Sequence, residues 1–329
     1  MWKNFWVLFL QLASNFTYGL SISWPTATSP IAKDAPLGID GCIQPTESGR
    51  LESGKFGFVR ENGTRFHEGI DIKSFEKTEN NVPADKIYAF MDGKVAYANR
   101  SPGASSYGSY VVVEHEHFLT LYAHLASVDV VVGQAVKAGE KIGILGTTSN
   151  CANIPNARAH VHFEIDFRIG DAHTFAKWYG ENFGDKNAHG TFNGINLVGI
   201  DPIAAIEKWL KGTKPADFFV GEREAATIQI ASTHVPSFVE RYAPLVARGI
   251  DLTKPVKGWR IEFSWFGLPQ KWTPLSAIDP KDPPLKLVSY RKSQKHNALL
   301  REVLREEETG IAIGPRLINT LKKMGFDVK

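Results

Sequence analysis

Two stretches decide the fold, His67-Glu-Gly-Ile-Asp71 and, much later in the chain, His160-Val-His162 within an alternating apolar frame. In the first stretch a His and an Asp flank a glycine, so a tight bend can turn both side chains toward one point. In the second, the two His are two residues apart, and on a β-strand they point to the same side. Two imidazoles and one carboxylate with an open fourth position are a ligand set of catalytic zinc. A His-x-His pair alone is common, but the combination of the two stretches predicts a metal site on a β-sheet.

The bulk composition is that of a globular protein and excludes some classes of function. The 329 residues leave room for one large or two ordinary domains, and 43% hydrophobic with 22% charged residues is typical of a chain with a buried core. The net charge of +3 is small, and no basic run or aromatic–basic stripe is present. The sequence therefore predicts no nucleic-acid partner.

The first residues resemble a targeting segment. A short positive start at Met1–Lys3 precedes an apolar stretch, Phe5–Ala13, that is too short to span a membrane, and small and polar residues follow. We interpret residues 1–22 as a cleaved signal peptide, with a buried N-terminal helix as the alternative. The protein is then exported to the periplasm, cell envelope or exterior, with no stable membrane span after cleavage.

The remainder divides into a β-rich part and a smaller second part. Residues 23–50 contain four prolines and predict an extended lead-in. From Phe56 onward, short apolar runs broken by glycines predict an antiparallel all-β core, with residues 170–190 as an insertion and a closing turn and helix ending near Leu210. The predicted strands are residues 111–113, 119–122, 128–132, 141–145 and 162–167.

A plausible linker at residues 211–215 separates a small α+β module, residues 215–329, of unknown function. Its His234 and His296 are isolated and are expected to be plain surface residues. The predicted helices are residues 237–248, 297–308 and 315–324, and the predicted strands are residues 259–265 and 285–290.

The order of these motifs resembles the lysostaphin/LytM-type zinc endopeptidases of bacterial cell walls. The resemblance covers about residues 50–168 and a short closing segment, and it implies a mainly β fold: a lysostaphin-type antiparallel β-sheet domain at residues 51–210. The matching stretches are Phe56-Gly-Phe-Val-Arg60, His67–Ile72, Ile87–Val95, Tyr107–Val113, Leu121-Tyr-Ala-His-Leu125, Gly133–Gly143, Gly146–Ser149 and His160–Glu164.

By this resemblance His67, Asp71 and His162 bind one Zn²⁺ per chain, while His124 and His160 assist as acid–base and oxyanion-stabilising groups. The residue types agree, because imidazole and carboxylate suit zinc and neutral imidazole suits proton transfer near pH 7. The implied substrate is the peptide part of peptidoglycan. Gly-Gly, D-Ala–diaminopimelate and D-Ala–Gly bonds all remain candidates, with a D-Ala cross-link favoured.

Several neighbouring residues are ambiguous. His115 and His117 form a second His-x-His pair, for which we expect no metal role. Glu164 continues the face of His162; a solvated strand residue is the expected state, and an acceptor that orients the ligand is the alternative. The loop at residues 146–159 is longer than is usual in the family and should border the substrate groove.

Two further predictions complete the sequence analysis. Cys42 and Cys151 are expected to form a disulfide in an exported chain, with two buried thiols as the alternative. Competing functions are a non-catalytic module that binds the wall or activates an amidase, and a carrier domain, because residues 132–139 resemble biotinyl and lipoyl hairpins. A carrier needs a modifiable lysine at a tight turn between hydrophobic flanks, a setting that Lys137 and Lys141 lack.

Overall fold

The computed structural model describes residues 21–184, 186–218, 224–243, 247 and 249–328. The predicted signal peptide therefore lies outside the described residues, except for Ser21 and Ile22. Within the described part of the chain, no helix is both long enough and apolar enough to cross a membrane.

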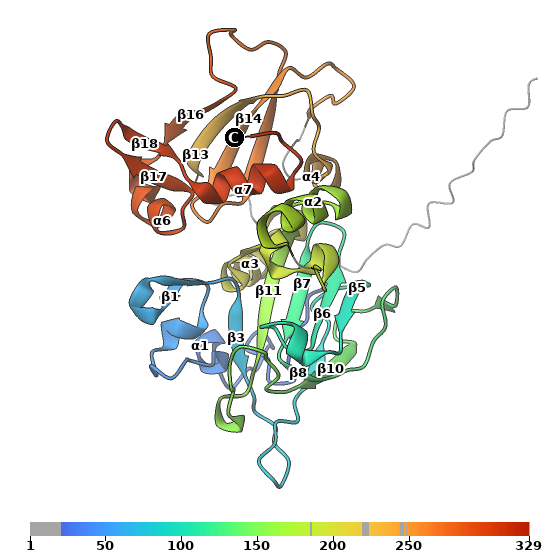
Figure 1. Ribbon diagram of the computed structural model, residues 1–329. Helices are drawn as coiled ribbons and strands as arrows, with labels where there is room; N and C mark the ends of the chain where they lie inside the picture. Colours follow the sequence, from blue (N-terminus) through green and yellow to red (C-terminus); the bar gives the residue numbers. More distant parts are fainter. Residues whose placement is uncertain (1–20, 185, 219–223, 244–246, 248, 329) are drawn as a thin grey trace, which may run out of the picture.

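An antiparallel β-sheet of seven strands forms the centre of the first part of the molecule, as predicted (Figure 1). Its strand order is β12-β11-β7-β6-β5-β9, and β3 also pairs with β11. The long strand β11 thus has β7 on one side, and β3 followed by β12 on the other. The strands are β3 (Ile70–Lys73), β5 (Gly93–Asn99), β6 (Tyr110–Glu114), β7 (Leu119–Ala123), β9 (Ala135–Val136), β11 (His160–Arg168) and β12 (Leu197–Ile200).

Two smaller sheets complete this β-rich part. One has the order β4-β10-β8, and the other is the hairpin β1-β2. The strand predicted at residues 128–132 is wrong after its first residue, because β8 ends at Val128 and the chain turns through the exposed Val131 and Val132. The strands are β1 (Gly57–Arg60), β2 (Arg65–His67), β4 (Lys86–Tyr88), β8 (Leu125–Val128) and β10 (Lys141–Leu145).

The lead-in is anchored more firmly than an extended arm would be. It contains the short helix α1 (Ile39–Cys42), and the side chains of Trp24 and Ile43 are buried in the core. Ile43 forms an antiparallel bridge with Ile72 of β3. The lead-in therefore supports the strand that carries Asp71.

The predicted insertion at residues 170–190 contains a helix, α2 (Ala172–Phe183). Asp171 caps its N-terminus by accepting from the backbone of His173 and Thr174, and the Thr174 hydroxyl completes a capping box. Gly184, at φ +69°, ends it in the left-handed conformation that glycine adopts without strain. The closing turn follows as predicted, with Asp201 capping α3 (Pro202–Leu210).

The C-terminal part is an α+β arrangement around a four-stranded antiparallel sheet, β15-β14-β13-β16, with the hairpin β17-β18 beside it. The helix predicted at residues 297–308 is wrong after its first four residues. It ends at Leu300, and Glu302 turns the chain at φ +59° into β17. The elements are β13 (Glu224–Ala231), α4 (Ser237–Arg241), β14 (Gly258–Ser264), β15 (Pro269–Leu275), β16 (Leu285–Tyr290), α6 (Lys295–Leu300), β17 (Leu304–Glu307), β18 (Gly310–Ile313) and α7 (Pro315–Lys323).

One continuous hydrophobic cluster joins the two parts of the chain. Aromatic pairs cross between them, with ring centroids 5.5 Å apart for Phe56 and Phe266, and 5.2 Å apart for Phe167 and Tyr242. Aromatic burial of this kind contributes strongly to packing. The domain boundary near residues 211–215 stays a prediction, but the C-terminal part is packed against the β-rich part.

The predicted disulfide is wrong in this structure, where both cysteines are free. Cys42 is buried beneath β3, with its Sγ 3.9 Å from the carbonyl of Thr28, whereas Cys151 is exposed on a loop with its Sγ 3.5 Å from the Ser149 hydroxyl. One thiol belongs to the core and the other to a surface loop, so they do not meet.

We therefore expect two reactive thiols per chain after denaturation without reductant, and one in the native protein. Burial raises the pKa of the Cys42 thiol and disfavours the reactive thiolate. Alkylation followed by mass spectrometry should locate the native modification at Cys151. If the denatured, unreduced chain had no reactive thiol, this result would support the predicted disulfide instead.

Candidate metal centre and active site

The register of β11 brings the predicted ligands together. His160 and His162 lie on one face of this strand, and His162 is directly opposite Asp71 of β3. His67 ends β2, one turn before β3. Gly69 allows that turn, because a Cβ there would lie 2.2 Å from the Phe163 carbonyl oxygen. The glycine bend expected from the sequence thus lies directly against β11.

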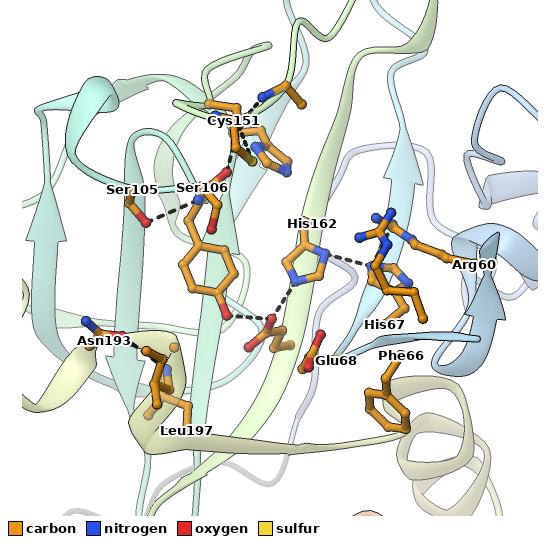
Figure 2. A pocket seen from close by; sticks show the side chains of 18 of the residues that line it. Arg60, Phe66, His67, Glu68, Ser105, Ser106, Cys151, His162, Asn193 and Leu197 are labelled. Carbon is orange, nitrogen blue, oxygen red and sulfur yellow. Dashed lines mark hydrogen bonds and ion pairs between the residues drawn. The ribbon is translucent and has the colours of Figure 1, made fainter. Parts of the chain in front are cut away.

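Three buried side chains converge on one point. His67 Nε2 lies 2.9 Å from His162 Nδ1, and each of these nitrogens lies 3.1 Å from Asp71 Oδ1. All three side chains are less than a tenth exposed. Figure 2 shows the His67 and His162 rings facing one another beside Arg60. Among the described residues, these three form the one cluster of three metal-ligand side chains within 4.8 Å of each other.

The outward nitrogens of both imidazoles are held by acceptors. His67 Nδ1 donates to the Lys55 carbonyl at 2.8 Å, and His162 Nε2 donates to Glu164 Oε1 at 2.5 Å. Such bonds fix the tautomer of a metal-binding His and leave the other nitrogen's lone pair for the metal. The donor set and its supporting bonds therefore fit a zinc ion.

Glu164 is not the solvated residue that we expected from the sequence. Its side chain is buried and also accepts from the Tyr107 hydroxyl at 3.0 Å. Burial disfavours its charge, but the neighbouring His162 outweighs this effect and lowers the pKa of Glu164. Glu164 is thus an anionic acceptor that orients His162, the alternative named above.

The electrostatics of the cluster favour an ionised Asp71. Burial alone would raise the pKa of this carboxyl, but His160 and His67 outweigh it and hold the pKa well below its usual range. Arg60 also donates to the Asp71 carboxylate and lies 2.9 Å from His67 Nε2. The sequence did not predict the contacts of Arg60. Only its place in the matching stretch before His67 indicated that it lies near the site.

His124 and His160 stand beside the cluster. Their ring centroids are 5.0 Å apart, and His160 Nε2 is 3.7 Å from Asp71 Oδ1. Their Nδ1 atoms bond to the carbonyls of Thr148 and Arg158, both at 2.8 Å, which leaves each Nε2 for other partners. Burial, together with the neighbouring His160 and His162, lowers the pKa of His124 to about 3, so this imidazole is neutral at pH 7.

The backbone at His124 is unusual. It connects β7 of the large sheet to β8 of the small one and has φ +62°, a left-handed conformation that costs a non-glycine residue about 1 kcal/mol or more. The chain changes sheets at this residue, and its side chain lines the cavity beside the cluster.

The second His-x-His pair is not part of the site. His115 is buried and bonds to the Asp92 carbonyl and the Thr120 hydroxyl, both at 2.8 Å. Burial lowers its pKa to about 4, so it serves the core as a neutral imidazole. In the C-terminal part, His234 is not a plain surface residue, because its Nε2 lies 2.8 Å from the Met324 carbonyl.

A cavity of about 1120 Å³ opens over the five site residues. The loop predicted to border the groove does so, through residues 149–154 and Arg158. The opposite side includes Trp178 of α2 and a set of C-terminal residues that sequence reasoning did not place in the site: Arg301, Glu302, Arg316, Asn319, Thr320 and Lys323.

Two imidazoles and a carboxylate on paired β-strands, with two more imidazoles in the same cavity, define a candidate metallohydrolase site. Residues 65–173, about a third of the chain, match the model described as Peptidase family M23. The matched segment contains all five of these side chains. The resemblance to lysostaphin/LytM-type endopeptidases is thereby confirmed.

Named relatives align with only part of this chain, and this chain aligns with only part of each of them. The chain is 38% identical over 80 residues to the peptidoglycan DD-endopeptidase ShyB of Vibrio cholerae, covering 24% of this chain and 17% of that protein. It is 32% identical over 125 residues to the murein hydrolase activator NlpD of Escherichia coli, covering 38% and 27%. The catalytic domain of lysostaphin from Staphylococcus simulans aligns with 27% identity and a TM-score of 0.25, covering 34% of this chain and 74% of that one. The chain spans at most about half the length of the curated relatives that it matches.

Proposed function

We propose that this protein is an exported zinc metalloendopeptidase that hydrolyses peptide cross-links of peptidoglycan. One observation carries the proposal: three ligand atoms converge on one point while the outward nitrogens of both imidazoles are bonded to acceptors. The domain at residues 51–210 would perform the chemistry, with His67, Asp71 and His162 as ligands of one Zn²⁺.

Zinc, when bound, would act as a Lewis acid on the scissile carbonyl and lower the pKa of water at its open position to roughly 7. The chain itself supplies the groups that move protons. His160, on the same face of β11 as His162, is placed to accept a proton from water and return it to the leaving amine. His124, neutral and fixed by Thr148, is placed to stabilise the developing oxyanion through Nε2–H.

The alternative is a non-catalytic module that binds the wall or activates an amidase. A related role, activation of a murein hydrolase, is stated in the name of NlpD. Such a module needs neither metal ligands nor proton-transfer groups. In this chain all five side chains are present in one cavity, and Glu164 and Lys55 orient two of them. These supporting bonds favour the enzyme.

Zinc-loaded protein incubated with purified sacculi should convert cross-linked muropeptide dimers to monomers, and a chelator should block the conversion. Separation of the muropeptides measures this directly and identifies the bond, for which we favour a D-Ala cross-link. New reducing sugar ends with intact dimers would instead indicate glycan cleavage. Unchanged muropeptides together with retained sacculus binding would favour the non-catalytic module.

A further inference from the structure

One face of the C-terminal helix α7 forms a polar wall of the active-site cavity. Arg316, Asn319, Thr320 and Lys323 follow one another at steps of three, one and three residues, so they share a helix face. All four line the cavity that contains the site histidines. In Figure 1, α7 (red) lies next to α2, at the boundary between the two parts of the chain. Thr320 and Lys323 are buried, and Arg316 and Asn319 are half-buried. A polar stripe on a helix that faces a cavity is suited to contact with a polar ligand.

Three cations meet at this wall, and one of them is paired. Arg301 forms an ion pair with Glu68 at 2.8 Å and stacks over Phe66, with its guanidinium carbon 3.7 Å from the ring centroid. Arg316 donates from Nε to the Arg301 carbonyl at 3.2 Å, and Lys323 donates from Nζ to the Ile195 carbonyl at 2.5 Å. Among the described residues, no ion pair joins a carboxylate to Arg316 or Lys323, although the charges of Glu68 and Glu302 partly offset that of Arg316. Lys323 also stacks over Trp178, with Nζ 4.6 Å from the ring centroid.

The charges of Arg316 and Lys323 are destabilised by burial and by neighbouring cations. Burial and the charges of Arg316 and Arg301 lower the pKa of Lys323 to about 7, and burial and the charge of Arg301 lower the pKa of Arg316 to about 10. Excess positive charge in a concave, partly desolvated wall is unfavourable unless an anion joins it. Arginine and lysine are the residues that bind carboxylates in such places, through charge-assisted hydrogen bonds.

We propose that Arg301, Arg316 and Lys323 form a subsite for a carboxylate of the substrate peptide, so that the C-terminal part selects peptides that carry this group unamidated. The inference rests on the proposed endopeptidase function and adds a determinant of its specificity. Two carboxylates of a cross-linked stem peptide could fill the subsite, the C-terminal one or the side-chain one of diaminopimelate.

The test uses three forms of one cross-linked muropeptide: the free acid, the C-terminal carboxamide and the side-chain carboxamide. The zinc-loaded full chain should cleave the free acid with a kcat/KM about tenfold or more above that of one carboxamide, as loss of a charge-assisted bond implies. The carboxamide that is cleaved more slowly than the free acid shows which of the two carboxylates binds in the subsite. In Arg316→Gln this ratio should fall to within about twofold, and Arg316→Lys should restore part of it.

Lys322→Gln is the matched control, because it removes a charge from the same helix at a residue outside the cavity lining, and its ratio should stay at the wild-type value. Equal cleavage of all three forms by the wild type, or an undiminished ratio in Arg316→Gln, would overturn the subsite and leave the endopeptidase intact. Calorimetric binding of the same peptides to zinc-loaded His160→Ala separates the two proposals further. If His160→Ala binds the free acid selectively but the wild type cleaves none of the peptides, the subsite proposal stands and the endopeptidase proposal fails. If His160→Ala binds all three peptides equally, the subsite proposal fails.

Discussion

Replacing His162 with alanine should reduce bound zinc from one ion per chain to almost none and abolish hydrolysis. In the proposed site His162 supplies one of three protein ligands, and its ring is bonded to Glu164. The two ligands that remain, His67 and Asp71, are one fewer than the three protein ligands that catalytic zinc sites use. Elemental analysis after dialysis against a weak chelator measures the effect.

His117→Ala is the matched control, because this second His-x-His pair makes no contact with the cluster and His117 lies at the surface side of its turn. It should retain one zinc per chain. The assignment of ligands would be wrong if zinc stayed near full occupancy in His162→Ala and disappeared in His115→Ala.

Replacement of His124 or His160 with alanine should leave the metal and the fold in place but lower kcat by about a hundredfold or more, the usual cost of losing an acid–base or oxyanion group. Neither imidazole belongs to the three converging ligands, and each is fixed by a backbone carbonyl rather than by the cluster.

Steady-state cleavage of a soluble cross-linked peptide should be measured beside zinc content and circular dichroism for each variant. Zinc content at the wild-type level with lost turnover supports the assignment. Activity within a few-fold of wild type in both variants would remove these two histidines from the mechanism.

The ligand cluster was predictable from the sequence because its chemistry is local. The spacing of His160 and His162 fixes their common face, and the glycine between His67 and Asp71 predicts the bend. The two stretches then meet through antiparallel pairing of β3 with β11, in the register that places Asp71 opposite His162. The five residues of the predicted site meet in one cavity, whereas their catalytic roles stay predictions.

The failed predictions depended on contacts between distant segments. Alternation places Glu164 on the face of His162, but the sequence does not show that this side chain is buried and bonded to Tyr107, which lies in a loop before β6. Residues 297–308 have helix-forming side chains, yet pairing of β17 with β18 overrides that preference. The C-terminal wall of the cavity likewise follows from packing across the whole chain.

The pairing of β11 with β3 and β7 has a consequence for when this chain acquires its metal. His67 and Asp71 belong to one short segment, whereas His162 follows Asp71 by 91 residues, and pairing of β3 with β11 brings the two segments within reach of one ion. An unfolded chain offers only isolated imidazoles and carboxylates, so high affinity arises with long-range strand pairing, which is among the slower events of folding. For the proposed zinc site we therefore expect metal capture to be a late step of maturation, so that a chain that has not closed its central sheet would be an inert precursor.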